Sequence, residues 1–132
     1  MKRGVWIIAV GFFLASCVVK TPITATQEWL QLLKNQQFEQ ATQHMVVITN
    51  QTPAPLTQEQ KDTFIAQYQQ NYQQIHSFSV DNMVALPEQT LKEMGIGEGY
   101  EVYYVQTSQK KGKQHLKTFV VKVGDQWKVV KK

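Results

Sequence analysis

The chain contains one cysteine, Cys17, and one arginine, Arg3, among its 132 residues. A single cysteine excludes an internal disulfide framework and any Cys-x-x-Cys metal or redox motif. With one arginine, the chain largely lacks the planar guanidinium groups that bind phosphate and guanine in a bidentate way. Nucleic-acid binding is therefore disfavoured, although the net charge is +4. At this length we expect one domain, which excludes a multidomain enzyme and a polytopic membrane protein.

Long apolar runs are also scarce, and the longest is Val5–Leu14, ten residues that follow Lys2 and Arg3. Ten helical residues rise about 15 Å, which is too short for a hydrocarbon core of about 30 Å. Positive charges, a short apolar stretch and then small residues are typical of a secretory signal. Removal of this segment leaves 12 basic and 10 acidic residues, a net charge of +2.

The segment Leu14-Ala15-Ser16-Cys17 comes directly at the end of this run and resembles the bacterial lipobox. The resemblance implies a diacylglyceryl group on the Cys17 thiol, cleavage before Cys17 by signal peptidase II, and acylation of the new amine. Two or more acyl chains anchor a protein stably in a membrane. In a Gram-negative cell, Val18 at the next position implies an outer-membrane lipoprotein that faces the periplasm. The alternatives are an unmodified signal peptide or a lone buried cysteine.

These features divide the chain into a signal peptide over residues 1–16, a lipidated cysteine with its tether over 17–24, and a folded domain over 25–132. A tether of this length reaches no more than about 25 Å, so the domain stays close to the membrane surface. Apart from the covalent lipid, no cofactor is expected.

Helical periodicity dominates the first half of the domain. Thr24 and Gln27 fit a capping box, and an apolar stripe that includes Trp29 predicts helices over 25–45 with a break near Asn35. Residues 46–56 are expected to form a loop because they contain two prolines. Thr57 opens a second capping box, which predicts a helix through about residue 74 with an aromatic stripe.

From His76 onward the hydrophobic period changes from 3.6 to 2. This pattern predicts four strands, over residues 77–86, 100–107, 116–123 and 127–131. A helical turn is predicted over 88–94, and Gly124-Asp125 suits a two-residue hairpin loop. The expected fold is α+β, with N-terminal helices packed on a four-stranded antiparallel sheet.

Three short motifs carry a second resemblance: Trp29-Leu-x-Leu-Leu-x-Asn-x-x-Phe38, Tyr100-x-Val-x-Tyr104 and Val123-Gly-Asp-Gln-Trp127-Lys-Val129. Together they are similar to small bacterial lipoproteins with a nuclear-transport-factor-2-like (cystatin-like) α+β roll, over residues 25–132. The resemblance implies a curved sheet around a long helix, with a concave apolar pocket. The residues that we expect to line it are Tyr68, Tyr72, Tyr104 and Trp127.

Enzymes of this fold resemble ketosteroid isomerase and use an Asp base beside tyrosine hydroxyls. Asp81 is the candidate base here, and its alternative role is a bulge or solvent-exposed position on a strand. The tyrosines have an alternative role as core rings. His44, His76 and His115 lie on separate elements and show no metal-ligand spacing. Gly95-x-Gly-x-Gly99 precedes a strand rather than a helix, so it does not fit a phosphate-binding loop.

Lys110, Lys111 and Lys113 cluster at the tip of a predicted hairpin. Such lysines protect strand edges, and they also suit contact with anionic lipid headgroups or an acidic partner. The sequence favours a non-enzymatic lipoprotein, anchored in the membrane, that binds a small apolar ligand or an envelope protein. The alternatives are a pocket enzyme of isomerase or dehydratase type and a pure protein-interaction module. The oligomeric state stays open.

Overall fold

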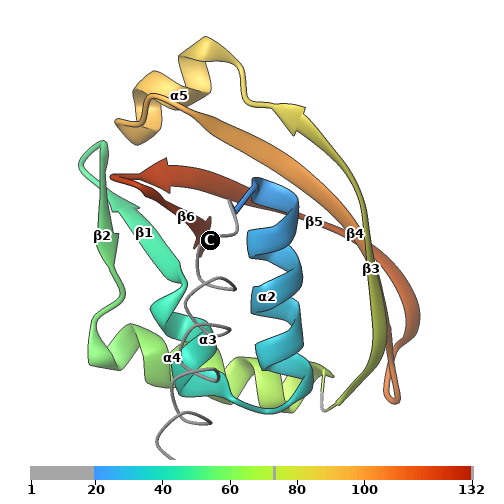
Figure 1. Cartoon of the computed structure of the whole chain (residues 1–132). Helices are drawn as coiled ribbons and strands as arrows, with labels where there is room; N and C mark the ends of the chain where they lie inside the picture. Colours follow the sequence, from blue (N-terminus) through green and yellow to red (C-terminus); the bar gives the residue numbers. More distant parts are fainter. Residues whose placement is uncertain (1–19, 73, 132) are drawn as a thin grey trace, which may run out of the picture.

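The computed structural model describes residues 20–72 and 74–131. Its elements follow the order α2 (Pro22–Lys34), α3 (Phe38–Gln43), β1 (Met45–Thr49), β2 (Thr52–Pro55), α4 (Gln58–Tyr72), β3 (Ile75–Ala85), α5 (Glu88–Met94), β4 (Gly99–Ser108), β5 (Gly112–Val123) and β6 (Gln126–Val130). The α+β class is confirmed. Figure 1 shows the sheet curving around α2, with α5 outside the curve and α4 across one end.

The sheet has six strands in the order β2-β1-β6-β5-β4-β3, so the expectation of four strands was wrong. It is also mixed rather than antiparallel, because β1 and β6 pair in parallel through Met45 with Val129 and Val46 with Val130. The other neighbouring strands are antiparallel. The two additional strands come from the segment that was predicted to be a loop.

That segment forms a hairpin for two physical reasons. Asn50 and Gln51 adopt φ angles of 51° and 59°, as a two-residue hairpin turn requires, and they connect Thr49 to its partner Thr52. Strand β2 lies at the edge of the sheet, where proline is tolerated. Pro53 and Pro55 lie at alternate positions of β2. Their backbone nitrogens, which carry no hydrogen, therefore face the same side of the strand, at the open edge of the sheet.

Helix α2 begins earlier than the sequence predicted, so residues 22–24 belong to the helix and not to the tether. Thr21 is the N-cap, and its backbone N–H donates to Thr24 Oγ1 at 2.7 Å while the Thr24 N–H donates to Thr21 Oγ1 at 3.2 Å. Pro22 occupies the first helical turn, where its missing donor costs nothing. The box predicted at Thr24 and Gln27 was therefore wrong.

Two other helix boundaries are as predicted. Asn35 caps the end of α2. At the start of α4, the Thr57 N–H donates to Gln60 Oε1 at 2.9 Å and the Gln60 N–H donates to Thr57 Oγ1 at 3.2 Å, which is the expected capping box.

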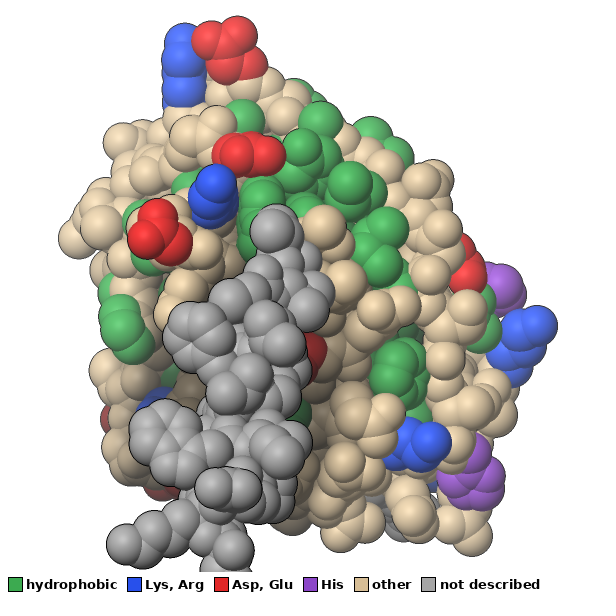
Figure 2. Space-filling model, viewed as in Figure 1, with side chains coloured by type: hydrophobic (Ala, Val, Ile, Leu, Met, Phe, Trp, Pro, Cys, Tyr) green, Lys and Arg blue, Asp and Glu red, His purple; other side chains and the backbone are tan. Residues whose placement is uncertain are grey.

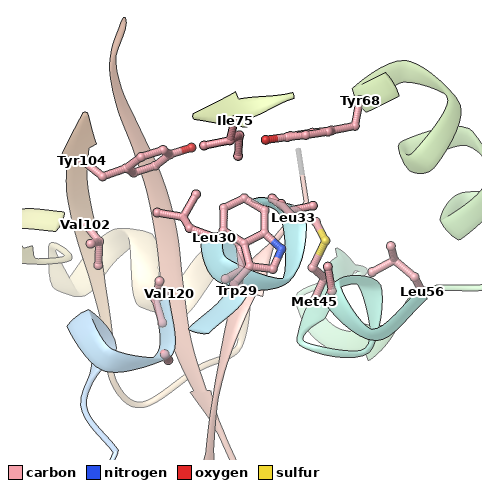
Figure 3. Close-up of a cluster of buried hydrophobic side chains, with 13 residues drawn as sticks. Trp29, Leu30, Leu33, Met45, Leu56, Tyr68, Ile75, Val102, Tyr104 and Val120 are labelled. Atoms are coloured by element: carbon pink, nitrogen blue, oxygen red, sulfur yellow. The ribbon is translucent and has the colours of Figure 1, made fainter. Parts of the chain in front are cut away.

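Hydrophobic side chains pack on both faces of the sheet. The inner core lies between α2 and the concave face, and its buried members include Trp29, Leu30, Leu33, Met45, Tyr68, Ile75, Val102, Tyr104, Val120 and Val129 (Figure 3). The outer core lies on the opposite face and consists of Val46, Leu86, Val121 and Val130, with Leu91 and Met94 of α5 packed against them. Side chains alternate along a strand, so neighbouring residues such as Val120 and Val121 reach different cores.

Charged side chains are scattered over the face shown in Figure 2, and much of that face is tan. In residues 20–72 and 74–131, no helix has the length and apolar character that crossing a membrane requires.

Candidate functional site

Strand β6 is shorter than β5 and pairs with only part of it. Their ladder runs from Val123 opposite Gln126 to Val120 opposite Val129 and ends there. Beyond this pair the chain follows β1 instead, since the Lys131 N–H donates to the Val46 carbonyl at 2.8 Å. Residues 112–118 of β5 therefore pair with β4 on one side and, within the described chain, with no strand on the other.

A depression of about 260 Å³ lies at the end of this ladder. Its described lining combines apolar side chains with a few polar ones: Trp29, Met45, Phe64, Gln67, Lys117, Thr118, Val129, Val130 and Lys131. These residues come from α2, α4 and three strands, so the site exists only in the folded chain. Apolar walls with a small number of polar groups are typical of ligand-binding sites. We call this depression the inner cleft.

Trp29 is the most informative residue of the inner cleft. Its side chain is 6% exposed, and its Nε1 is buried with no hydrogen-bond partner in the described chain. Figure 3 shows the nitrogen-bearing edge of the indole facing Met45, which lines the same cleft. A buried donor without an acceptor costs about 1–3 kcal/mol, and buried tryptophan N–H groups usually find a partner.

The charges around the inner cleft are positive. Of the described residues that line it, none is acidic and two are lysines. Lys117 forms an ion pair with Glu101 at 3.6 Å. Lys131 follows the last residue of β6 and lines the cleft together with Val129. An anion would therefore be favoured near Lys131.

Three of the four residues predicted to line a pocket lie outside the inner cleft, and the side chain of the fourth, Tyr72, is outside what the structure describes. Tyr68 and Tyr104 are each 8% exposed and belong to the inner core. In Figure 3 their hydroxyl groups point toward one another across Ile75. Trp127 packs against Tyr100 with ring centroids 5.8 Å apart. The structure thus brings two of the tyrosines together, as core rings.

A polar pair accompanies these tyrosines on the inner face. Gln106 is 2% exposed, stands directly opposite Gln114 on β5, and accepts a hydrogen bond of 3.4 Å from the Tyr68 hydroxyl. Gln106 Nε2 and Gln114 Oε1 are buried without a partner in the described chain. The sequence analysis missed both residues. A signal was present, because each glutamine takes an alternate position in line with apolar residues of its strand.

Asp81 lies on the solvent-exposed edge strand β3, at a register shift between Val80 and Asn82. Its carboxylate accepts a hydrogen bond of 3.2 Å from Ser79 Oγ. It borders an open depression of about 350 Å³ whose lining includes Tyr103, His115 and Tyr104, so one of the tyrosines predicted to line a pocket borders this depression beside the candidate base. The Tyr103 hydroxyl donates to the Glu101 carboxylate, which raises the pKa of Tyr103. Asp81 is therefore not the buried carboxylate that an isomerase-like site needs.

The lysine hairpin is partly occupied by structural contacts. Lys110 Nζ donates to the Gln70 carbonyl at 3.0 Å, in the last turn of α4, where carbonyl groups lack helical partners. The Lys111 N–H donates to Ser108 Oγ at 3.2 Å, and Lys113 is exposed. The hairpin therefore contacts the end of α4 through Lys110, and the predicted contact surface of the three exposed lysines stays a prediction.

In the described chain, His, Asp, Glu and Cys side chains form no group of three that could hold a metal ion. His44 caps the end of α3, and burial, together with nearby Lys128 and Lys20, lowers its pKa against the opposing effect of Glu28. Cys17 and the lipobox lie outside the described residues. Comparisons with protein-family models, with curated proteins and with solved structures gave no match to this chain.

Proposed function

We propose that this protein is a membrane-anchored periplasmic lipoprotein whose domain binds a small apolar ligand in the inner cleft, without catalysing a reaction. The observation that carries the proposal is a cleft at the end of the β5–β6 ladder, lined by a buried indole whose N–H has no partner in the described chain. A buried donor without an acceptor, in a residue that lines a cleft, favours the binding of a molecule that supplies the acceptor.

The anchor rests on the lipobox at Leu14–Cys17. Since α2 begins at Pro22, only residues 18–21 would separate the lipidated Cys17 from the folded domain. Four residues reach at most about 14 Å, so the domain would lie directly at the membrane surface. Cys17→Ser should release the protein from the membrane fraction and abolish incorporation of labelled fatty acid. Lys20→Ser is the matched control, because it changes the same segment without removing the acceptor thiol.

The curved sheet around α2 also supports the resemblance to nuclear-transport-factor-2-like (cystatin-like) rolls. In this proposal α2 and α4 cover the concave side, and the ligand enters at the end of the β5–β6 ladder. The inner cleft then takes the place of the pocket that the sequence analysis assigned to Tyr68, Tyr72, Tyr104 and Trp127.

Native mass spectrometry of residues 18–132 tests ligand binding directly. All helices and strands of the described chain lie between Pro22 and Val130, so this form contains all of them. We expect a reproducible extra mass of a small molecule on protein purified gently from the periplasm. Consistent absence of added mass, together with failure to bind any apolar probe, would contradict the proposal.

A second candidate function follows from the open edge of β5. Its residues 112–118 could pair with an extended strand of an envelope protein. This function predicts that a proline in place of His115 blocks crosslinking to a partner in intact cells. It also predicts that adding a small-molecule ligand does not change the yield of that crosslink.

A further inference from the structure

We infer that the ligand of the inner cleft is an apolar molecule carrying a carboxylate, which accepts a hydrogen bond from Trp29 Nε1 and lies near the Lys131 ammonium group. This inference rests on the proposed function and names the chemical class of its ligand. The argument has three parts: the unsatisfied donor, the charge of the lining and the size of the cleft.

The donor determines what the ligand must contain. An indole nitrogen can only donate a hydrogen bond, so a molecule that satisfies Trp29 has to supply an acceptor atom. A plain hydrocarbon would leave the N–H unsatisfied, and an ammonium group has no acceptor to offer. The hydroxyl of Thr118, buried in the same lining, is a second group that can donate.

The charges determine which acceptor is favoured. The described lining contains no carboxylate, and it includes Lys131 together with Val129, whose side chain is 2% exposed. Hydrogen bonds to an ionised acceptor are roughly twice as strong as neutral ones, and partial burial reduces screening by water. The lining has no arginine fork for a phosphate. One N–H, one hydroxyl and one ammonium group match the two oxygens of a carboxylate.

The volume determines the size of the apolar part. A water molecule occupies about 30 Å³ in the liquid, so 260 Å³ corresponds to roughly nine such volumes. A chain of eight carbons with its carboxylate is of this size. Its methylene groups would contact apolar members of the lining such as Trp29, Met45 and Phe64.

The test uses residues 18–132, which contain two indole groups, Trp29 and Trp127. Their ¹⁵N–¹H signals are assigned with Trp127→Phe and followed while octanoate, octanol or octylamine is added. We expect octanoate to shift the Trp29 N–H signal downfield and to bind at least tenfold more tightly than octanol. Octylamine should bind more weakly than either, and the Trp127 signal should stay in place.

Lys131→Met provides the charge test, with Lys113→Met on the exposed hairpin as its matched control. We expect Lys131→Met to weaken octanoate binding about tenfold while octanol binding is retained, and Lys113→Met to change neither. Equal binding of octanoate and octanol, or tighter binding of octylamine, would overturn the carboxylate inference and leave the proposed function standing. If none of the three probes shifts the Trp29 signal or binds at all, the proposed function fails together with the inference.

Discussion

The two faces of the sheet are packed in different ways, although they share the same strands. On the outer face, aliphatic side chains of β1, β5 and β6 pack against α5. On the inner face, the core around α2 includes aromatic rings, and buried glutamines stand beside it. The three buried polar side-chain atoms without a partner in the described chain, Trp29 Nε1, Gln106 Nε2 and Gln114 Oε1, are all on the inner side.

This difference bears on the stability of the two cores and on the proposed function. An aliphatic core contributes its burial energy without polar groups to satisfy, about 25 cal/mol per Å² of apolar surface removed from water. An inner core that keeps unsatisfied donors is less stable than it could be, and such sites are typically functional. In the proposed function, the inner core provides the site, and the outer core has no part in ligand binding.

The largest effect on stability is expected at Gly95, which caps the C-terminal end of α5. Gly95 has a φ of +70°, and a Cβ added there would lie 1.8 Å from the Gln51 carbonyl oxygen. Gly95→Ala should lower the free energy of unfolding by about 2–4 kcal/mol, from left-handed strain and overpacking together. Urea denaturation measures the change.

Gly97→Ala is the matched control for this substitution, because a Cβ there meets no atom of the described chain within 4 Å. It should change the free energy of unfolding by no more than about 0.5 kcal/mol. Equal effects of the two substitutions would show that the contact between the end of α5 and the β1–β2 turn does not contribute to stability.

A smaller effect on stability is expected at the inner core. Trp29→Phe keeps an aromatic ring and removes the unsatisfied N–H, so the lost packing and the relieved desolvation cost oppose each other. The unliganded protein should change by about 1 kcal/mol or less in its free energy of unfolding, while octanoate binding falls at least tenfold. A loss of about 3 kcal/mol or more, typical of a tightly packed core residue, would contradict a binding role for the N–H.

The smallest effect concerns pH. The pKa of His44 is lowered in the folded protein, chiefly by burial, from its ordinary value of 6.5. The unfolded chain therefore binds a proton more readily, and stability should fall as the pH drops below about 6.5 toward the folded pKa. His44→Gln should remove part of this fall. Urea midpoints at pH 7.5, 6.5 and 5.5 provide the comparison.

Local signals predicted much of the fold. The capping box at Thr57, the helix over Glu88–Met94 and the four C-terminal strands follow from short-range chemistry and periodicity. The hairpin over residues 45–55 was missed because proline opposes strands in general, whereas the edge position that tolerates it depends on the tertiary fold.

The candidate site was not predictable for the same reason. The inner cleft lies at the end of the β5–β6 ladder, where β6 also pairs with β1, and β1 was expected to be part of a loop. Without that strand, Trp29 was identified only as a helix core residue and Lys131 only as a strand-end lysine. Tyr68 and Tyr104 were chosen for their hydroxyl groups, which the structure places within the core.

The central claim is that the inner core admits a ligand and the outer core does not. Residues 18–132 contain three methionines, of which Met45 lines the inner cleft and Met94 packs on the outer core. We would label the methionine methyl groups with ¹³C and add octanoate. The account predicts a saturable shift of the Met45 signal with Met94 unchanged. A shift of Met94 without Met45, or no shift of Met45 at saturating probe, would contradict it.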